Sequence, residues 1–165
     1  MFASRFVSGT RKRIIAAFFL CAVVGLTLTL PAGQAGSKAD CDQVEGTLRE
    51  QVTGADPVQS VGRLRGDIKG DYSFVLTAGS PSQTPDVVHF DGRSEVQTKD
   101  GKIFFSDAGA ISNVGRGNLA YLSTIRDGTG DWAGATGQLL FRGFVDPVSG
   151  RGVSDYVGEV CTQDD

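Results

Sequence analysis

Short apolar or alternating stretches, separated by turns that contain glycine, recur along the chain after residue 40. Between Asp40 and Cys161, no segment of ten or more residues repeats its apolar positions with the 3.6-residue period of a helix. This pattern predicts an all-β protein. The expected strands span residues 45–52, 58–68, 71–77, 87–98, 102–112, 118–126, 139–145 and 153–161.

The strand expected at residues 87–98 has two distinct faces. Its odd positions from His89 to Gln97 are all polar, whereas Val88, Phe90 and Val96 occupy the other face. One face of this strand therefore meets water or a polar interior. The dipeptide Asp100-Gly101 follows directly, and it is a strong signal for a tight hairpin into the next strand.

Eight strands joined mostly by short turns predict an up-and-down antiparallel meander. Such a meander either closes into a barrel or leaves long strand edges exposed to aggregation. We expect closure, which makes the first and last strands neighbours. An eight-stranded barrel has an interior that is filled by side chains or holds one small ligand.

The first 35 residues have the pattern of a secretory signal peptide. They contain four basic residues and no acidic ones, an apolar run at residues 14–30, and the small-residue exit Gly33-Gln34-Ala35. We expect a signal helix that is cleaved after Ala35, leaving a single domain at residues 36–165 in a secreted or periplasmic compartment. The alternative is an uncleaved anchor, the one arrangement that would hold the protein at a membrane. Residues 14–30 make a segment of only 17 residues, at the short end of what spans a bilayer.

The predicted mature domain is acidic. Twelve of the 16 basic residues and all 19 acidic residues lie after residue 35, which gives a net charge of −7. Nucleic acids and anionic membranes attract basic surfaces. No nucleic-acid partner is therefore expected.

Two cysteines remain after the predicted cleavage, Cys41 and Cys161. In a secreted chain they most simply form one disulfide that encloses almost the whole domain, and two buried free thiols are the alternative. A disulfide closing a loop of this size contributes at most about 4–5 kcal/mol. The chain has one histidine, His89, and no Cys-x-x-Cys spacing, so neither a metal site nor a cofactor is predicted.

The stretch from Gly128 to Arg142 is the most distinctive in the chain. Its first ten residues contain four glycines, so the backbone turns tightly before an apolar strand begins. A glycine-rich run can also hold a phosphate, but the third glycine and helix of a dinucleotide fold are missing here, and no Gly-Lys-Ser/Thr follows. The stretch is interpreted as a hairpin hinge, whose structural residues are Gly128, Thr129, Gly130, Ala135 and Gly137.

This motif, with the final strand Val153-Ser-Asp-Tyr-Val-Gly-Glu-Val160, resembles the last two hairpins of the allene oxide cyclase and dirigent superfamily, and in particular its secreted bacterial members. Trp132 stands where those relatives usually have phenylalanine. The resemblance implies an eight-stranded calycin-like barrel with a central apolar cavity, and a trimer as in plant relatives. Plant members steer cyclisation or radical coupling of small hydrophobic molecules. The matching positions are architectural, so catalytic residues are not assigned.

Five residues are candidates for contact with a ligand. Trp132 either plugs a barrel end or forms a pocket wall. Tyr121 and Tyr156 lie mid-strand and place their phenols either in the cavity or on the surface. Arg142 interrupts an apolar strand, so it either faces solvent or pairs with a carboxylate inside. Asp107, set in an apolar strand, is a candidate cavity carboxylate with a raised pKa.

The sequence predicts a secreted barrel that binds a small apolar or amphipathic molecule in its cavity. An isomerase or cyclase working in the same cavity is the first alternative, so enzymatic activity stays open. A filled barrel with a structural or protein-interaction role is the second. Consecutive apolar residues such as Phe104-Phe105 and Leu139-Leu140 indicate an outer-face contact and hence a homo-oligomer or another partner.

Overall fold

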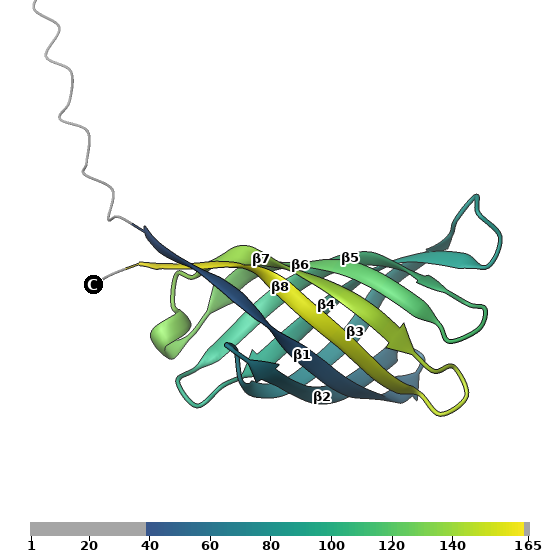
Figure 1. Ribbon diagram of the computed structural model, residues 1–165, viewed down its shortest axis with the longest axis horizontal. Coiled ribbons are helices and arrows are strands. Elements are labelled where there is room, and N and C mark those ends of the chain that lie inside the picture. Colours follow the sequence, from purple (N-terminus) through teal and green to yellow (C-terminus); the bar gives the residue numbers. More distant parts are fainter. Residues whose placement is uncertain (1–38, 164–165) are drawn as a thin grey trace, which may run out of the picture. The chain divides into compact units, whose positions relative to one another are not determined.

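The computed structural model describes residues 39–163, which form a closed eight-stranded antiparallel barrel (Figure 1). Each strand pairs with the next along the chain, and the last pairs with the first. The fold class and the up-and-down order predicted from sequence are confirmed. The predicted signal segment lies outside the described residues. The strands are β1 (Ala39–Ala55), β2 (Val58–Gly66), β3 (Gly70–Pro81), β4 (Val87–Gln97), β5 (Lys102–Ser112), β6 (Asn118–Gly128), β7 (Thr136–Val145) and β8 (Arg151–Gln163).

All eight predicted strands exist, but several run further than their apolar pattern. β1 begins at Ala39, six residues before the stretch expected at 45–52, and β8 (Arg151–Gln163) extends two residues past each end of the stretch expected at 153–161. The reason is that the two strands pair with each other from Ala39–Gln163 to Gln51–Arg151, so backbone hydrogen bonds fix residues whose side chains carry no strand signal. In Figure 1, β1 and β8 lie side by side along this seam.

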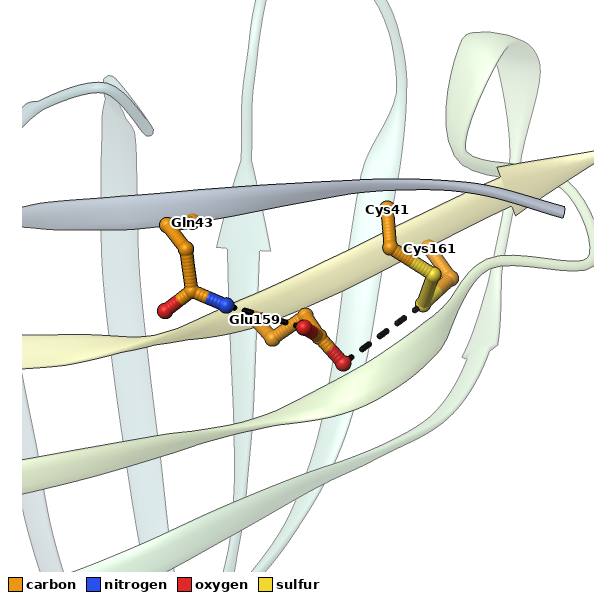
Figure 2. Close-up of a disulfide and its surroundings, with 4 residues drawn as sticks. All are labelled: Cys41, Gln43, Glu159 and Cys161. Atoms are coloured by element: carbon orange, nitrogen blue, oxygen red, sulfur yellow. Dashed lines mark hydrogen bonds between the residues drawn. A yellow bond between two sulfur atoms is a disulfide. The ribbon is translucent and has the colours of Figure 1, made fainter.

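The disulfide lies at one end of this seam. Cys41 is directly opposite Cys161 in the β1–β8 register, their Cα atoms are 4.0 Å apart, and the two sulfur atoms are bonded (Figure 2). Beside the disulfide, Gln43 donates a hydrogen bond of 2.8 Å to Glu159 across the same two strands. The predicted pairing is confirmed, and it fits a secreted or otherwise oxidising compartment. We call this end of the barrel the disulfide end and the other the open end.

The glycine-rich motif closes the disulfide end. It forms a short 3-10 helix, η1 (Gly130–Trp132), which lies at the same end of the barrel as the last residues of β8 (Figure 1). Thr129 anchors it: its hydroxyl accepts a hydrogen bond of 3.0 Å from the Lys102 amide, and its own amide donates to the Lys102 carbonyl. Gly130 has φ +63°, and a Cβ there would lie 2.1 Å from the Asp100 carbonyl. Only glycine fits this position.

A second glycine of the motif permits close strand contact. Gly137, near the start of β7, has φ +137°, and a Cβ there would lie 2.1 Å from the Glu159 carbonyl of β8. Ala135, two residues earlier, is buried in the core. Gly128 likewise leaves no room for a side chain, because the Trp132 carbonyl would lie 1.9 Å from its Cβ. The motif therefore forms the turn between β6 and β7 and docks on the β4–β5 turn.

The interior is apolar at the disulfide end and mixed in the middle. Buried aliphatic side chains from five strands surround the disulfide end; they are Val44, Leu64, Val96, Ile103 and Val160. Towards the middle, aromatic rings take over: Tyr121 stacks on Phe141 with centroids 4.7 Å apart, and Phe141 packs against Tyr156 at 5.5 Å. No helix among residues 39–163 is both long and apolar enough to cross a membrane.

Candidate functional site

A cavity of about 290 Å³ occupies the half of the barrel nearest the open end. Its walls come from seven of the eight strands and are mostly apolar, with the rings of Phe74 and Phe90 edge to face at 6.1 Å. The volume is about twice that of an engineered apolar cavity that binds benzene, and it lies at the small end of natural ligand pockets. The apolar lining consists of Val52, Val58, Phe74, Leu76, Val88, Phe90, Ile111, Leu119 and Val145.

Polar side chains line the cavity at mid-barrel. Glu50 of β1, Tyr72 of β3 and Tyr121 of β6 all contribute to its surface. Glu50 lies five residues before the end of β1, Tyr121 is the fourth residue of β6 and Tyr72 is the third residue of β3, which begins at the disulfide end. Val58 and Val88 are the first and second residues of β2 and β4, beside the open end. A molecule that enters from the open end therefore passes apolar walls before its leading group reaches these three residues.

Glu50 is half-buried and has one side-chain partner across the sheet. The Ser60 hydroxyl of β2 donates a hydrogen bond of 2.5 Å to Glu50 Oε2. Burial raises the pKa of Glu50 above its ordinary value of 4.5, the Ser60 hydrogen bond opposes this, and the negative charge of Asp107 adds to it. The environment therefore favours the protonated carboxyl more than water does.

Asp107 is the second interior carboxyl, buried deeper than Glu50. Ser94 donates a hydrogen bond of 3.1 Å to Asp107 Oδ1, and Ser123 donates a short one to the same oxygen. The other oxygen, Oδ2, has no partner among the described residues. Burial raises the pKa of Asp107, against the hydrogen bonds from Ser123 and Ser94 and the charge of Arg126. The predicted raised pKa is thus found, although Asp107 lies beside the cavity lining and not in it.

The two cavity tyrosines keep their protons. Burial raises the pKa of both Tyr72 and Tyr121 well above 10, and for Tyr72 the charges of Glu50 and Asp107 add to this. Tyr121 is 5% exposed, and its hydroxyl has no hydrogen-bond partner among the described residues. The two phenols lie close enough to influence each other's ionisation. A neutral phenol facing a cavity both donates and accepts hydrogen bonds.

The other tyrosine named from sequence, Tyr156, has a structural role. It is 2% exposed, and its hydroxyl donates to the Ile68 carbonyl at 3.2 Å and accepts from the Ile68 amide at 3.0 Å. These bonds tie β8 to the turn between β2 and β3. Tyr156 points inward, but its hydroxyl is fully engaged and it does not line the cavity.

Trp132 and Arg142 also lie away from the cavity. Trp132 packs against the core at the disulfide end, and its indole nitrogen donates a hydrogen bond of 3.0 Å to the Thr98 hydroxyl. It plugs that end, which is the first of its two predicted roles. Arg142 is exposed on the outer face of β7, opposite Ala120 and Asp155. The hypothesis of an inward-facing arginine is corrected: Leu139 and Phe141 take the inward positions, and strand alternation turns Arg142 outward.

Of the five candidates, the structure thus brings Tyr121 and Asp107 together at mid-barrel. Sequence reasoning missed Glu50, Tyr72 and Ser60. Tyr72 shares one face of its strand with Phe74 and Leu76, a pattern that places it inward. Glu50 alternates with Leu48 and Val52, so it occupies an apolar position of β1. This alternation is the sequence signal that indicates an inward Glu50, but it is hard to recognise because Arg49 and Gln51, on either side of Glu50, are also polar.

One group of possible metal ligands lies outside the barrel. Donor atoms of Cys41, Cys161 and Glu159 fall within 4.8 Å of one another. The two sulfur atoms are bonded to each other, so neither is the thiolate that a metal requires (Figure 2). This group offers a carboxylate alone while the disulfide is intact.

The outer surface also carries a basic patch that net charge does not predict. Arg49 of β1 lies directly opposite Arg63 of β2, and Arg65 and Arg151 line the same surface hollow. Arg63 pairs with Asp71 at 2.8 Å. Like charges directly opposite each other in a sheet are destabilising.

The fold and cavity define a small closed β-barrel with an internal site that opens at one end. Two solved structures of this general kind are pterocarpan synthase dirigent proteins. GePTS1 is 16% identical, with a TM-score of 0.32 over 78% of this chain and 93% of that one. PsPTS1 is 15% identical, with a TM-score of 0.31 over 76% and 97%. Neither score establishes a shared family or reaction. No protein-family model and no curated protein matches the chain.

Proposed function

We propose that this protein binds a small apolar or amphipathic molecule inside its barrel. The observation that carries the proposal is the cavity of about 290 Å³, with aliphatic and aromatic walls and a buried Tyr121 hydroxyl that lacks a partner. Unpaired buried polar groups are costly, and a ligand oxygen or nitrogen at this position would satisfy the hydroxyl. The same cavity argues against the alternative of a filled, purely structural barrel.

A binding experiment with a matched variant tests this proposal. Isothermal titration calorimetry with 1-naphthylmethanol, a neutral aromatic alcohol of about 12 heavy atoms, should detect binding. Even a binding free energy of −0.3 kcal/mol per heavy atom gives a total of about −4 kcal/mol, which corresponds to a Kd near 1 mM or below. Leu76→Trp fills the cavity and should abolish binding, whereas Val157→Trp, on the outer face, should not. Equal binding by wild type and Leu76→Trp would refute the cavity as the site.

An isomerase or cyclase is the second candidate, and the two interior carboxyls favour it. Burial raises the pKa of both Glu50 and Asp107, so each holds a proton to higher pH than an exposed carboxyl. Glu50 lines the cavity and can donate its proton to a bound molecule. Incubation with lipid epoxides and phenolic radicals, followed by product analysis, tests this function. Turnover that Glu50→Gln abolishes would establish it, and unchanged product distributions with purified protein would exclude it for these substrates.

We further propose that the mature protein is residues 36–165, secreted or periplasmic after signal cleavage at Ala35. The disulfide supports this compartment. Kinship with secreted bacterial members of the allene oxide cyclase and dirigent superfamily is part of the proposal, supported by the motif from Gly128 to Gly137. N-terminal sequencing of the protein purified from its source tests the cleavage site. A chain that keeps residues 14–30 and sediments with membranes would favour the anchored alternative.

We also propose that the barrel forms a homo-oligomer, with a trimer as the expectation from the resemblance. Outward apolar residues on β5 to β8 align in register: Ala108 opposes Leu122, Leu122 opposes Leu140, and Leu140 opposes Val157. Leu122 and Leu140 are each 39% exposed. Light scattering measures the mass, and Leu140→Asp should dissociate the oligomer. A wild-type monomer at 100 µM would refute it.

A further inference from the structure

The mid-barrel part of the cavity has acidic and aromatic groups but no basic ones. Glu50, Tyr72 and Tyr121 face it, and none of its 15 lining residues is lysine, arginine or histidine. The second carboxyl, Asp107, lies close enough to raise the pKa of Glu50. The described interior therefore holds two acids and no side chain that carries a compensating positive charge.

The side chains near Glu50 in the barrel interior are uncharged or acidic. β2 contributes Ser60, β3 contributes Tyr72, β5 contributes Asp107 and β6 contributes Tyr121. From β8, the inward residues are Gly152 and Ser154, which are neutral. Arg49, which precedes Glu50, and Arg151, which lies opposite Gln51 in the β1–β8 register, occupy outward, exposed positions, as does Arg126 of β6.

We propose that the ligand of this cavity is a small amphipathic amine, bound as its ammonium ion against Glu50 with its apolar part towards the open end. This inference rests on the proposed binding function and names its ligand class. An ammonium group has three donors, and acceptors face it: the Glu50 carboxylate and the hydroxyls of Tyr72 and Tyr121. The Tyr121 hydroxyl, buried and without a partner, is an independent sign that a polar group of the ligand belongs there.

Aromatic walls strengthen the match with a cation. The rings of Phe74, Phe90 and Tyr121 line the same cavity, with Phe90 and Tyr121 centroids 5.8 Å apart. A cation within about 6 Å of a ring face gains roughly 0.5–2 kcal/mol, and more of this is realised where water is excluded. A neutral ligand gains no such cation–aromatic energy and leaves Glu50 without a counter-charge. An anionic ligand would add a third negative group.

Three probes of one shape separate these ligand classes: 1-naphthylmethylamine, 1-naphthylmethanol and 1-naphthoic acid. Calorimetry at pH 8 should give the amine a Kd at least tenfold lower than that of the alcohol, and the acid the weakest binding. As pH falls, protonation of Glu50 should weaken the binding of the amine and leave the Kd of the alcohol unchanged. Glu50→Gln should remove the tenfold preference while the alcohol Kd changes by less than about threefold.

Glu45→Gln is the matched control, because Glu45 lies on the same strand and is exposed, so it should keep the amine preference. Tighter binding of the alcohol or the acid to wild type would overturn the inference and leave the binding function standing. So would an amine preference that survives Glu50→Gln. Failure of all three probes to bind would overturn both proposals together.

Discussion

Tyr121 and Tyr156 are both buried and face the interior, but their hydroxyls differ in hydrogen bonding, and this predicts opposite effects of the same substitution. The Tyr121 hydroxyl is buried without a partner, whereas the Tyr156 hydroxyl makes two hydrogen bonds to the Ile68 backbone. Removing an unsatisfied buried polar group recovers its desolvation cost of about 1–3 kcal/mol. Tyr121→Phe should therefore raise the free energy of unfolding by about 1–2 kcal/mol in the absence of ligand, because the stack on Phe141 is retained.

Tyr156→Phe should lower the free energy of unfolding by about 1–3 kcal/mol, since it leaves the Ile68 amide and carbonyl without their partner. Urea denaturation followed by circular dichroism measures both values, and an unchanged m-value confirms that the unfolding reaction is the same. The two variants lose the same atom from rings of similar burial, so each controls for the other.

If Tyr121→Phe lowers the free energy of unfolding by more than about 0.5 kcal/mol, this reasoning is refuted, because the Tyr121 hydroxyl must then already have a hydrogen-bond partner. The same variant should also weaken the binding of 1-naphthylmethylamine, although it is the more stable protein. Residues that serve function at a binding site often lower the stability of the folded protein. A variant that is more stable and binds equally well would show that Tyr121 has no role in binding.

Further predictions concern the disulfide, the buried acid and the arginine pair. The double variant Cys41→Ser/Cys161→Ser should lose about 2–5 kcal/mol in urea denaturation, since the bond spans 120 residues; a loss below 1 kcal/mol would show that β1–β8 pairing already constrains the unfolded chain. Asp107 has a folded pKa above its ordinary 3.8, so the folded state binds the extra proton and stability falls as pH rises through that window. Asp107→Asn removes this contribution, and its stability relative to wild type should increase from pH 3.5 to pH 7; a constant difference would contradict the raised pKa. Arg49→Gln should stabilise by about 0.2–1 kcal/mol in low salt and less in 1 M NaCl, because it removes a cation opposite Arg63; an equal gain at both salt concentrations would rule out charge repulsion as the cause.

The strands and their closure could be predicted from the sequence because each has a local signal. Alternation in residues 87–98 gave the two faces of β4, Asp100-Gly101 gave the hairpin into β5, and two terminal cysteines gave the seam between β1 and β8. Strand ends were less predictable, because backbone pairing with a neighbour extends a strand past its apolar pattern. Ala39 to Val44 show this in β1.

The cavity could be predicted only in part. Asp107 was identified because it interrupts an apolar strand, but Glu50 stands between Arg49 and Gln51 and resembles an ordinary exposed residue. Its inward direction depends on the register of β1 against β2 and β8. The volume of the cavity depends on side chains from seven strands together, including the Phe74 ring, which lies over Gly92 where any Cβ would clash. No local sequence pattern predicts a cavity volume that depends on side chains from so many strands.

The central claim is that the open half of the barrel holds a small molecule. Nuclear Overhauser spectroscopy of the protein with 1-naphthylmethanol tests this most directly, since the naphthyl protons report which side chains they contact. Cross-peaks to the methyl groups of Leu76 and Val88 and to the ring of Tyr121 are predicted. Cross-peaks to the outer methyl groups of Leu140 and Val157 alone, with none from the cavity, would contradict the account.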